Sequence, residues 1–76
     1  MNMAVERDRL EMDGVVIEAN KSIFKVRVGD DHIVTATLSG KIRQNSVKIL
    51  VADLVTVEVS PYDLTKGRIV YRHKKA

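Results

Sequence analysis

Apolar and polar residues alternate along three stretches of the chain. In residues 24–28, 34–38 and 55–59, a hydrophobic side chain recurs at every second position, with lysine, arginine, threonine or glutamate between. A period of two places successive side chains on opposite faces of a strand, and the β-branched residues that are common here suit a pleated surface. The pattern predicts three half-buried strands, with Phe24 on the inward face of the first.

Two further strands are expected nearer the ends of the chain. Residues 10–17 alternate less cleanly, and Gly14 among them indicates a β-bulge or a tight bend at a barrel corner. Residues 68–72 have an apolar middle between Arg68 and Arg72. Simple alternation would point both guanidinium groups to the same side of this last strand.

The connections between these strands predict the fold. Turn residues at 19–22 and 29–31 favour a meander of three antiparallel strands, and residues 61–67 would close a later hairpin. Ser39 can cap a helical turn within residues 39–45, between the third and fourth strands. Five strands with a short helix at that place predict an all-β OB-fold barrel. An SH3-like barrel is the alternative, although its helical turn usually comes later.

Length and composition limit the other possibilities. Residues 1–76 are expected to form a single domain with a thin core, with a flexible N-terminus at 1–9 and a basic flexible tail at 73–76. The chain has no cysteine, and His32 and His73 show no zinc-ligand spacing, so we expect no metal or other cofactor. No apolar stretch is typical of a signal peptide or a membrane span, which favours a soluble cytoplasmic protein.

The net charge of +3 is unevenly distributed. Residues 1–38 carry five basic and seven acidic groups, a balance of −2, whereas residues 39–76 carry eight basic and three acidic groups, a balance of +5. Most of the excess follows Pro61. This asymmetry indicates a polyanionic partner, nucleic acid before membrane.

Motifs of catalysis are missing from the sequence. The four glycines are widely separated, so they form no phosphate-binding loop. A serine–histidine–aspartate group could be drawn from Ser39, His32 and Asp53, but nothing in their spacing supports it. The chain is therefore not expected to be an enzyme.

Basic residues are the better candidates for function. The segment 39–45 brings lysine, arginine and amide side chains together, and such groups bind phosphates, sugars and base edges. A second group stands on and before the last strand. The basic candidates in these two groups are Lys41, Arg43, Lys66, Arg68 and Arg72.

Aromatic residues are few, which bears on the kind of nucleic acid. Proteins that hold flexible single strands use several exposed aromatic rings for stacking. Here Phe24 has the inward register, and only Tyr62 and Tyr71 remain. Recognition of a folded, phosphate-rich RNA surface therefore fits better.

Two segments resemble a known family. Residues 34–43 read VTATLSGKIR and residues 61–72 read PYDLTKGRIVYR. Together they closely resemble bacterial translation initiation factor 1, and the likeness extends over about 10–72. The resemblance implies an OB-fold protein that binds the small ribosomal subunit at the decoding A site, contacts ribosomal RNA and rearranges its decoding adenines. It also implies cooperation with initiation factors 2 and 3, exclusion of tRNA from the A site early in initiation, and a monomer.

The resemblance also implies residue roles. Ser39 and Gly40 would shape the loop that approaches the decoding adenines, and Lys48 matches a basic residue frequent in the family. The implied RNA-binding set is Ser39, Gly40, Lys41, Arg43, Lys48, Lys66, Arg68 and Arg72.

The sequence departs from the family pattern at three positions. Ser46 stands where an aromatic or bulky residue is frequent, Ala52 replaces a frequent glycine, and Thr37 stands where some members have histidine. Two alternative functions share a small barrel, namely a cold-shock-type RNA chaperone and an SH3-type protein-interaction domain. The scarcity of aromatic residues speaks against the chaperone, and resistance of binding to RNase would favour the interaction domain.

Overall fold

A computed structural model describes residues 9–44 and 48–73. Within these residues the chain forms five strands and one short helix. The strands are β1 (Leu10–Asn20), β2 (Ile23–Val28), β3 (His32–Leu38), β4 (Leu54–Ser60) and β5 (Asp63–Arg72), and the helix is α2 (Gly40–Gln44). No helix in the described ranges is long and apolar enough to cross a membrane.

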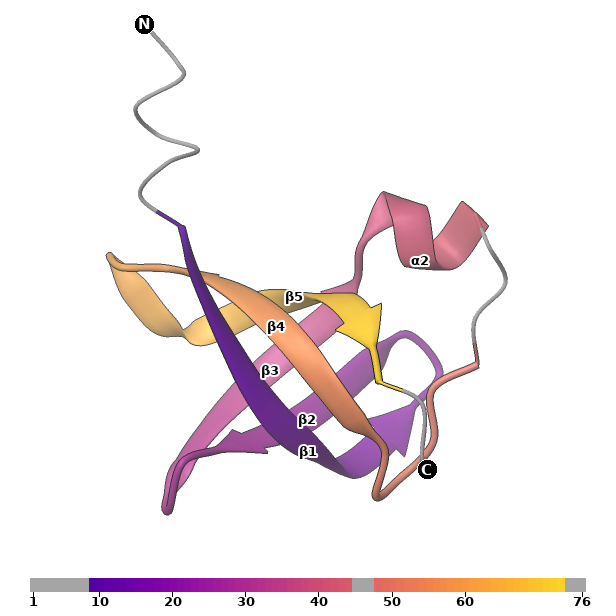
Figure 1. Cartoon of the computed structure of the whole chain (residues 1–76), viewed down its shortest axis with the longest axis horizontal. Coiled ribbons are helices and arrows are strands. Elements are labelled where there is room, and N and C mark those ends of the chain that lie inside the picture. Colours follow the sequence, from indigo (N-terminus) through magenta and orange to yellow (C-terminus); the bar gives the residue numbers. More distant parts are fainter. Residues whose placement is uncertain (1–8, 45–47, 74–76) are drawn as a thin grey trace, which may run out of the picture.

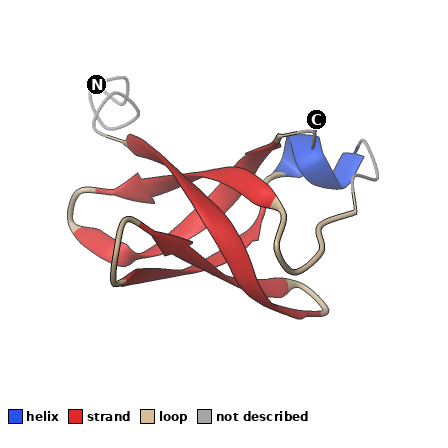
Figure 2. Cartoon of the chain, turned by 60° about the horizontal axis from the view of Figure 1, so that its bottom comes forward, coloured by secondary structure: helices blue, strands red, loops and turns tan. Residues whose placement is uncertain are grey.

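The strands close into a barrel in the order β1-β2-β3-β5-β4 (Figure 1). All neighbours are antiparallel except β3 and β5, which run parallel. The helix lies at one end of the barrel, beside the end of β5 (Figure 2). Five strands with a short helix between β3 and β4 confirm the predicted OB-fold.

The core consists mainly of β-branched side chains. The inward positions of the three alternating stretches are buried as predicted, including Phe24 at 5% exposure, except that Leu38 is only partly buried. Ile42 of the helix and Ile49 after it are also buried. Among the described residues, every buried side-chain nitrogen or oxygen has a hydrogen-bond partner. The thin core of the described residues therefore leaves no buried polar side-chain atom unpaired, which a small domain without cross-links needs.

Gly14 lies in the part of β1 that pairs with both β2 and β4. The bulge in β1 is at Ile17, because the β1–β2 register shifts between Val16 and Glu18. A Cβ at Gly14 would come within 2.6 Å of the Arg27 carbonyl oxygen, so close strand approach is what requires glycine here. The bulge lies three residues after Gly14, and a bend at Gly14 itself stays a prediction.

The last hairpin is tighter than predicted. Strand β5 begins at Asp63 and includes Gly67, so the turn between β4 and β5 is only Pro61 and Tyr62. The hydroxyl of Ser60 accepts the backbone N–H of Tyr62 at 3.1 Å. Asp63 Oδ1 accepts both the backbone N–H of Thr65, at 3.1 Å, and its hydroxyl, at 2.5 Å. These local bonds, with the fixed φ of proline, hold the turn in one shape.

Of the predicted flexible termini, 1–8 and 74–76 lie outside the described residues. Arg9 pairs with Glu58, and the backbone N–H of His73 donates to the Leu54 carbonyl oxygen at 2.9 Å. Each of these two residues is thus bonded to β4.

Candidate nucleic-acid interface

The loop-helix segment is held by Ser39. Its hydroxyl accepts the backbone N–H of Ile42 at 3.2 Å, and its carbonyl accepts the N–H of Arg43 at 3.0 Å. Ser39 is itself buried, so it caps the helix as predicted. With Ile42 inserted into the core, Lys41 and Arg43 remain exposed on the helix surface. The helix α2 is thus anchored to the barrel and presents the positively charged side chains of Lys41 and Arg43 to solvent.

The exposed surface of α2 adjoins the outer face of β3 and β5. The backbone N–H of Ser39 donates to the Ile69 carbonyl oxygen at 3.0 Å, and in the parallel ladder Thr37 pairs with Arg68 and Thr35 with Lys66. Arg68 and Lys66 are exposed, as are the threonines between them and β2. The structure therefore joins the two basic groups of the sequence into one surface.

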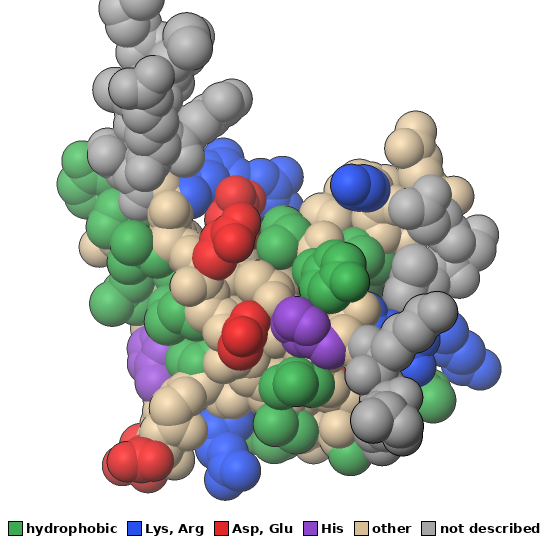
Figure 3. All heavy atoms as spheres, viewed as in Figure 1, with side chains coloured by type: hydrophobic (Ala, Val, Ile, Leu, Met, Phe, Trp, Pro, Cys, Tyr) green, Lys and Arg blue, Asp and Glu red, His purple; other side chains and the backbone are tan. Residues whose placement is uncertain are grey.

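Lys25 extends this surface onto β2. It pairs with Thr35, which in turn pairs with Lys66, so the two lysines stand on either side of one small threonine. We call the joined surface the basic face; its described members are Lys25, Lys41, Arg43, Lys66 and Arg68. In Figure 3, lysine and arginine side chains appear at the upper edge of the barrel, beside α2 and at the lower right and lower edges, while the centre of the face toward the viewer carries acidic, histidine and hydrophobic side chains. An anionic partner is therefore expected to avoid the centre of this face.

Glu58 organises two arginines beside the basic face. Its Oε1 accepts from Arg9 at 2.9 Å and from Arg68 at 3.2 Å, and its side chain is 22% exposed. Burial alone would raise the pKa of Glu58, but the hydrogen bonds and charges of Arg9 and Arg68 outweigh burial and hold that pKa below its ordinary value of 4.5.

This shift predicts a pH dependence of stability. Because the folded-state pKa of Glu58 lies below the unfolded-state pKa, its pairing stabilises the fold above pH 4.5 and is lost as the pH falls through the folded-state pKa. We expect Glu58→Gln to flatten the acid side of the curve of unfolding free energy against pH, measured by urea titration. An unchanged acid limb in Glu58→Gln would contradict this assignment.

Arg72 lies apart from Arg68, contrary to the prediction that both face the same way. The β4–β5 register shifts so that Thr56 pairs with Tyr71 while Val57 pairs with Ile69, which leaves Val70 as a bulge. The extra residue reverses the alternation, and Arg72 then pairs with the inward residue Val55 rather than following the outward side of Arg68.

A buried carboxylate holds Arg72. The Nε–H of Arg72 donates to Asp53 Oδ2 at 3.1 Å, and the side chain of Asp53 is only 6% exposed. The same Oδ2 accepts the backbone N–H of Leu50 at 2.8 Å. Arg72 is thus a structural residue that anchors the connection before β4, whatever else it contacts.

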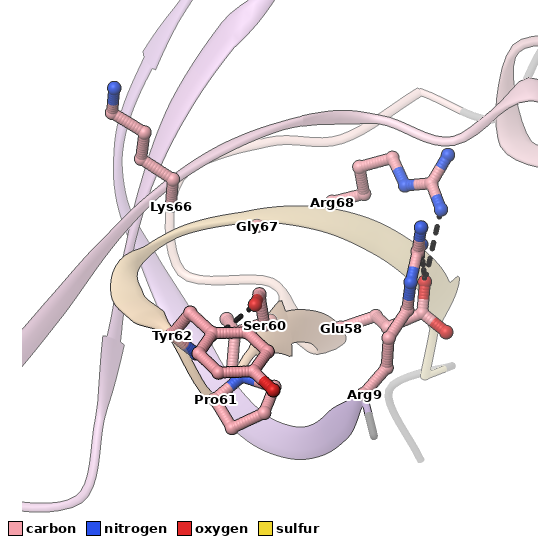
Figure 4. A pocket seen from close by; sticks show the side chains of 9 residues that line it. Arg9, Glu58, Ser60, Pro61, Tyr62, Lys66, Gly67 and Arg68 are labelled. Carbon is pink, nitrogen blue, oxygen red and sulfur yellow. Dashed lines mark hydrogen bonds and ion pairs between the residues drawn. The ribbon is translucent and has the colours of Figure 1, made fainter. Parts of the chain in front are cut away.

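A pocket of about 290 Å³ opens at the other end of β5. Figure 4 shows Arg9 and Arg68 converging on Glu58 at one side, and the Pro61–Tyr62 turn at the other. Lys66 lines it too, and the side chain of Tyr62 is 87% exposed. The pocket thus has the solvent-exposed ring of Tyr62 on one side and the guanidinium groups of Arg9 and Arg68 on the other.

The comparisons with known proteins agree with this geometry. A family model described as translation initiation factor 1A / IF-1 matches residues 2–76, almost the whole chain. The chain belongs to this family. The solution structure of translation initiation factor 1 from the Wolbachia endosymbiont strain TRS of Brugia malayi is 34% identical, with a TM-score of 0.74 over 90% of this chain and 82% of that one. The resemblance to bacterial translation initiation factor 1 is confirmed.

Two larger proteins share the barrel of this IF-1 family member. The circularly permuted GTPase YloQ is 19% identical with a TM-score of 0.74, and YjeQ from Thermotoga maritima is 24% identical with a TM-score of 0.70. In each, the match covers 87% of this chain and 23% of the other. These likenesses show the fold alone.

The structure places two of the three residues that differ from the family pattern. Ser46 lies outside the described residues. Ala52 has a φ of 80°, in the left-handed region that favours glycine, so the frequent glycine of the family has a plain physical reason. Ala52 is held there because its N–H donates to the Val16 carbonyl oxygen at 2.7 Å. Thr37 lies on the outer surface beside Arg68.

The other two residues of the implied RNA-binding set lie on the surface. Gly40 and Lys48 are exposed, Gly40 at the start of α2 and Lys48 in the connection to β4.

The three residues of the hypothetical catalytic group have separate bonding partners. Ser39 caps α2, His32 Nε2–H donates to the Leu64 carbonyl oxygen at 2.6 Å, and Asp53 holds Arg72.

Sequence reasoning missed Arg9, Lys25 and Glu58. Arg9 and Glu58 are 49 residues apart, and nothing local in the sequence signals their contact. Lys25 carried a usable signal, because the alternation at 24–28 gives that strand a basic outer face. A second missed cluster lies two residues from Glu58 along β4: Thr56 donates to Asp13 at 2.6 Å and accepts from His73 Nε2 at 2.8 Å.

Proposed function

We propose that this IF-1 family member binds the small ribosomal subunit at its decoding A site through ribosomal RNA. In this proposal it acts as a cytoplasmic monomer, keeps tRNA out of the A site early in initiation and assists initiation factors 2 and 3. The observation that carries the proposal is the basic face, which unites Lys41 and Arg43 of the helix with Lys66 and Arg68 of β5 on an IF-1 scaffold.

The arrangement of the basic face supports RNA backbone as its partner. Lysine and arginine ends are exposed above a floor of threonine side chains, which lets phosphates approach without displacing large side chains. Arg68 gives one N–H to Glu58 and keeps further donors, because a guanidinium group has five. Ser39 and Gly40 would then act by shaping the loop, since the Ser39 side chain is buried.

Binding to purified small subunits should depend steeply on salt. Each phosphate contact adds about 0.7–0.9 to the slope of log affinity against log salt concentration, because counterions are released. We expect Arg68→Gln to lower the slope by about that amount, with little change in melting temperature, because the Arg68 side chain is 47% exposed and the Glu58 carboxylate keeps Arg9. Sedimentation at a series of salt concentrations measures the slope.

Arg27→Gln is the matched control. It removes the same charge from the outer face of β2, two residues beyond Lys25, where its paired neighbours are Val15 and Ile33 and not the threonines that pair with β5. No association of the wild-type protein at low salt would refute subunit binding, and a flat salt response would refute phosphate contact. RNA footprinting on the small subunit, with and without the protein, tests the A-site location directly.

A further inference from the structure

We propose that a groove at the end of the barrel opposite α2 docks a basic protein segment, which inserts one large apolar side chain. This inference goes beyond the proposed function, because no residue that lines the groove belongs to the basic face. The groove has a volume of about 440 Å³, within the range of roughly 300–1,000 Å³ that ligand clefts span. Its lining residues are Met12, Asp13, Val28, Gly29, His32 and Leu64.

The groove lies where β1, the β2–β3 turn and the start of β5 meet. In Figure 1 this turn and the β4–β5 turn are on the left, whereas α2 is on the right. Val28 pairs with His32 across the β2–β3 turn, and the Nε2–H of His32 donates to the Leu64 carbonyl oxygen at 2.6 Å. These bonds hold the walls of the groove in place before a partner arrives, so little conformational entropy is lost on docking.

The surface of the groove is largely apolar. Val28 forms its buried part at 4% exposure, and Met12 is partly buried against the core. Leu64 is 41% exposed, and Leu10, at 45%, stands two residues before Met12 on the same face of β1. An aliphatic side chain of a partner would remove these surfaces from water, and exposed apolar groups around a hollow are typical of protein-interaction sites.

Carboxylates surround the groove. Among the lining residues and their immediate neighbours in the sequence, five residues are acidic and one is a lysine or arginine. The acidic residues are Glu11, Asp13, Asp30, Asp31 and Asp63, and the basic one is Arg27. Arg27 lies on the outer face of β2, where it pairs with Val15 and Ile33. This rim repels RNA phosphates and attracts lysine and arginine, so it favours a basic protein segment over nucleic acid.

Two of these carboxylates are held in the ionised form by hydrogen bonds. The bond from the Thr56 hydroxyl lowers the pKa of Asp13 below its ordinary value of 3.8. The hydroxyl and backbone N–H of Thr65 likewise lower the pKa of Asp63. Both side chains therefore stay charged at neutral pH, and the acidic turn at 30–31 is exposed beside them. The negative rim accordingly persists under the conditions in which a partner would bind.

An NMR titration of the full chain with a synthetic pentapeptide, Lys-Lys-Leu-Lys-Lys with blocked termini, tests the docking site. The methyl resonances of Met12 and Leu64 should move with a common dissociation constant of about 1 mM, because one buried leucine and a few surface charge contacts supply binding of that order. The methyl groups of Leu50, which is 49% exposed outside the groove, are the internal control. Met12 and Leu64 resonances that stay in place up to about 10 mM peptide overturn the proposal.

Two further peptides separate the contributions of charge and of the apolar side chain. Glu-Glu-Leu-Glu-Glu keeps the leucine but reverses the charge, and it should leave the Met12 and Leu64 resonances in place. Lys-Lys-Ser-Lys-Lys keeps the charge without the leucine, and it should bind about 10-fold more weakly than the leucine peptide. Equal binding of all three peptides overturns the proposal. A single-stranded hexaribonucleotide that shifts the same methyl resonances also overturns it, in favour of RNA at this end of the barrel.

Variants of the protein test the same two contributions. Leu64→Ala should bind the leucine peptide about 5-fold more weakly, because part of the apolar wall is lost. Ile23→Ala is the matched control, since Ile23 is 42% exposed at the opposite end of β2 from Val28, and it should bind as the wild type does.

The acidic turn is tested by Asp30→Asn combined with Asp31→Asn. This double variant should also bind the leucine peptide about 5-fold more weakly, and the difference from the wild type should shrink at high salt, because surface charges are screened. Wild-type affinity in both Leu64→Ala and the double variant overturns the docking site and leaves the proposed binding of RNA by the basic face intact.

Discussion

Gly67→Ala should lower the free energy of unfolding by about 2–3 kcal/mol and the melting temperature by about 10–20 °C. A Cβ at this position would lie 2.7 Å from the Glu58 carbonyl oxygen and 2.7 Å from Val59 Cγ1. The first contact is with backbone of the neighbouring strand, so relief requires β4 and β5 to move apart. Thermal unfolding followed by circular dichroism measures the effect.

Gly40→Ala provides the matched control. It makes the same chemical change in α2, where a new Cβ meets nothing within 4 Å, and alanine favours helix over glycine. We expect it to leave the melting temperature unchanged or slightly higher. Equal melting temperatures for Gly67→Ala and the wild type would show that the barrel accommodates a side chain between Lys66 and Arg68.

Arg72→Ala should lower the free energy of unfolding by about 2–3 kcal/mol, because it leaves the Asp53 carboxylate buried without its counter-ion. The Asp53 side chain is 6% exposed and would keep only its bond from the Leu50 N–H. Arg68→Ala, by contrast, should lower it by at most about 1 kcal/mol, because Glu58 is more exposed and retains Arg9. Urea unfolding of both variants measures the difference.

A double variant separates loss of the ion pair from loss of packing. Asp53→Asn in the Arg72→Ala background removes the uncompensated charge while an amide oxygen can still accept from Leu50. We expect the double variant to be more stable than Arg72→Ala alone. If Arg72→Ala is as stable as Arg68→Ala, the buried pair does not anchor the connection, and any loss of RNA binding in Arg72→Ala can be attributed to the RNA contact.

Arg68 and Arg72 differ in their surroundings, so variants of the two cannot be interpreted in the same way in an RNA-binding assay. Arg68 joins Lys66 and the helix cations on the basic face, whereas Arg72 follows the bulge at Val70 and points to a different partner. Reduced RNA binding by an Arg72 variant therefore needs a stability measurement beside it. Lys25, Lys66 and Arg68 are the better probes of the interface because their side chains are exposed.

Much of the fold could be predicted because it depends on local chemistry. A period of two and β-branched residues determine strands at 24–28, 34–38 and 55–59, and burial alone sets which face is inward. Ser39 determines where the helix begins, because its hydroxyl satisfies an N–H three residues on. Together with the excess of basic groups after residue 38, these features were sufficient for an OB-fold with a cationic loop-helix.

The arrangement of the site depended on contacts that no local pattern encodes. The parallel pairing of β3 with β5 brings the two basic groups together, and the Val70 bulge removes Arg72 from them. A bulge depends on the register between strands, because one extra residue reverses every later side chain. Arg9 meets Glu58 only because the barrel closes. The sequence by itself determined the strands, the cap and the sign of the charge, whereas only the tertiary structure decided which charges share a face.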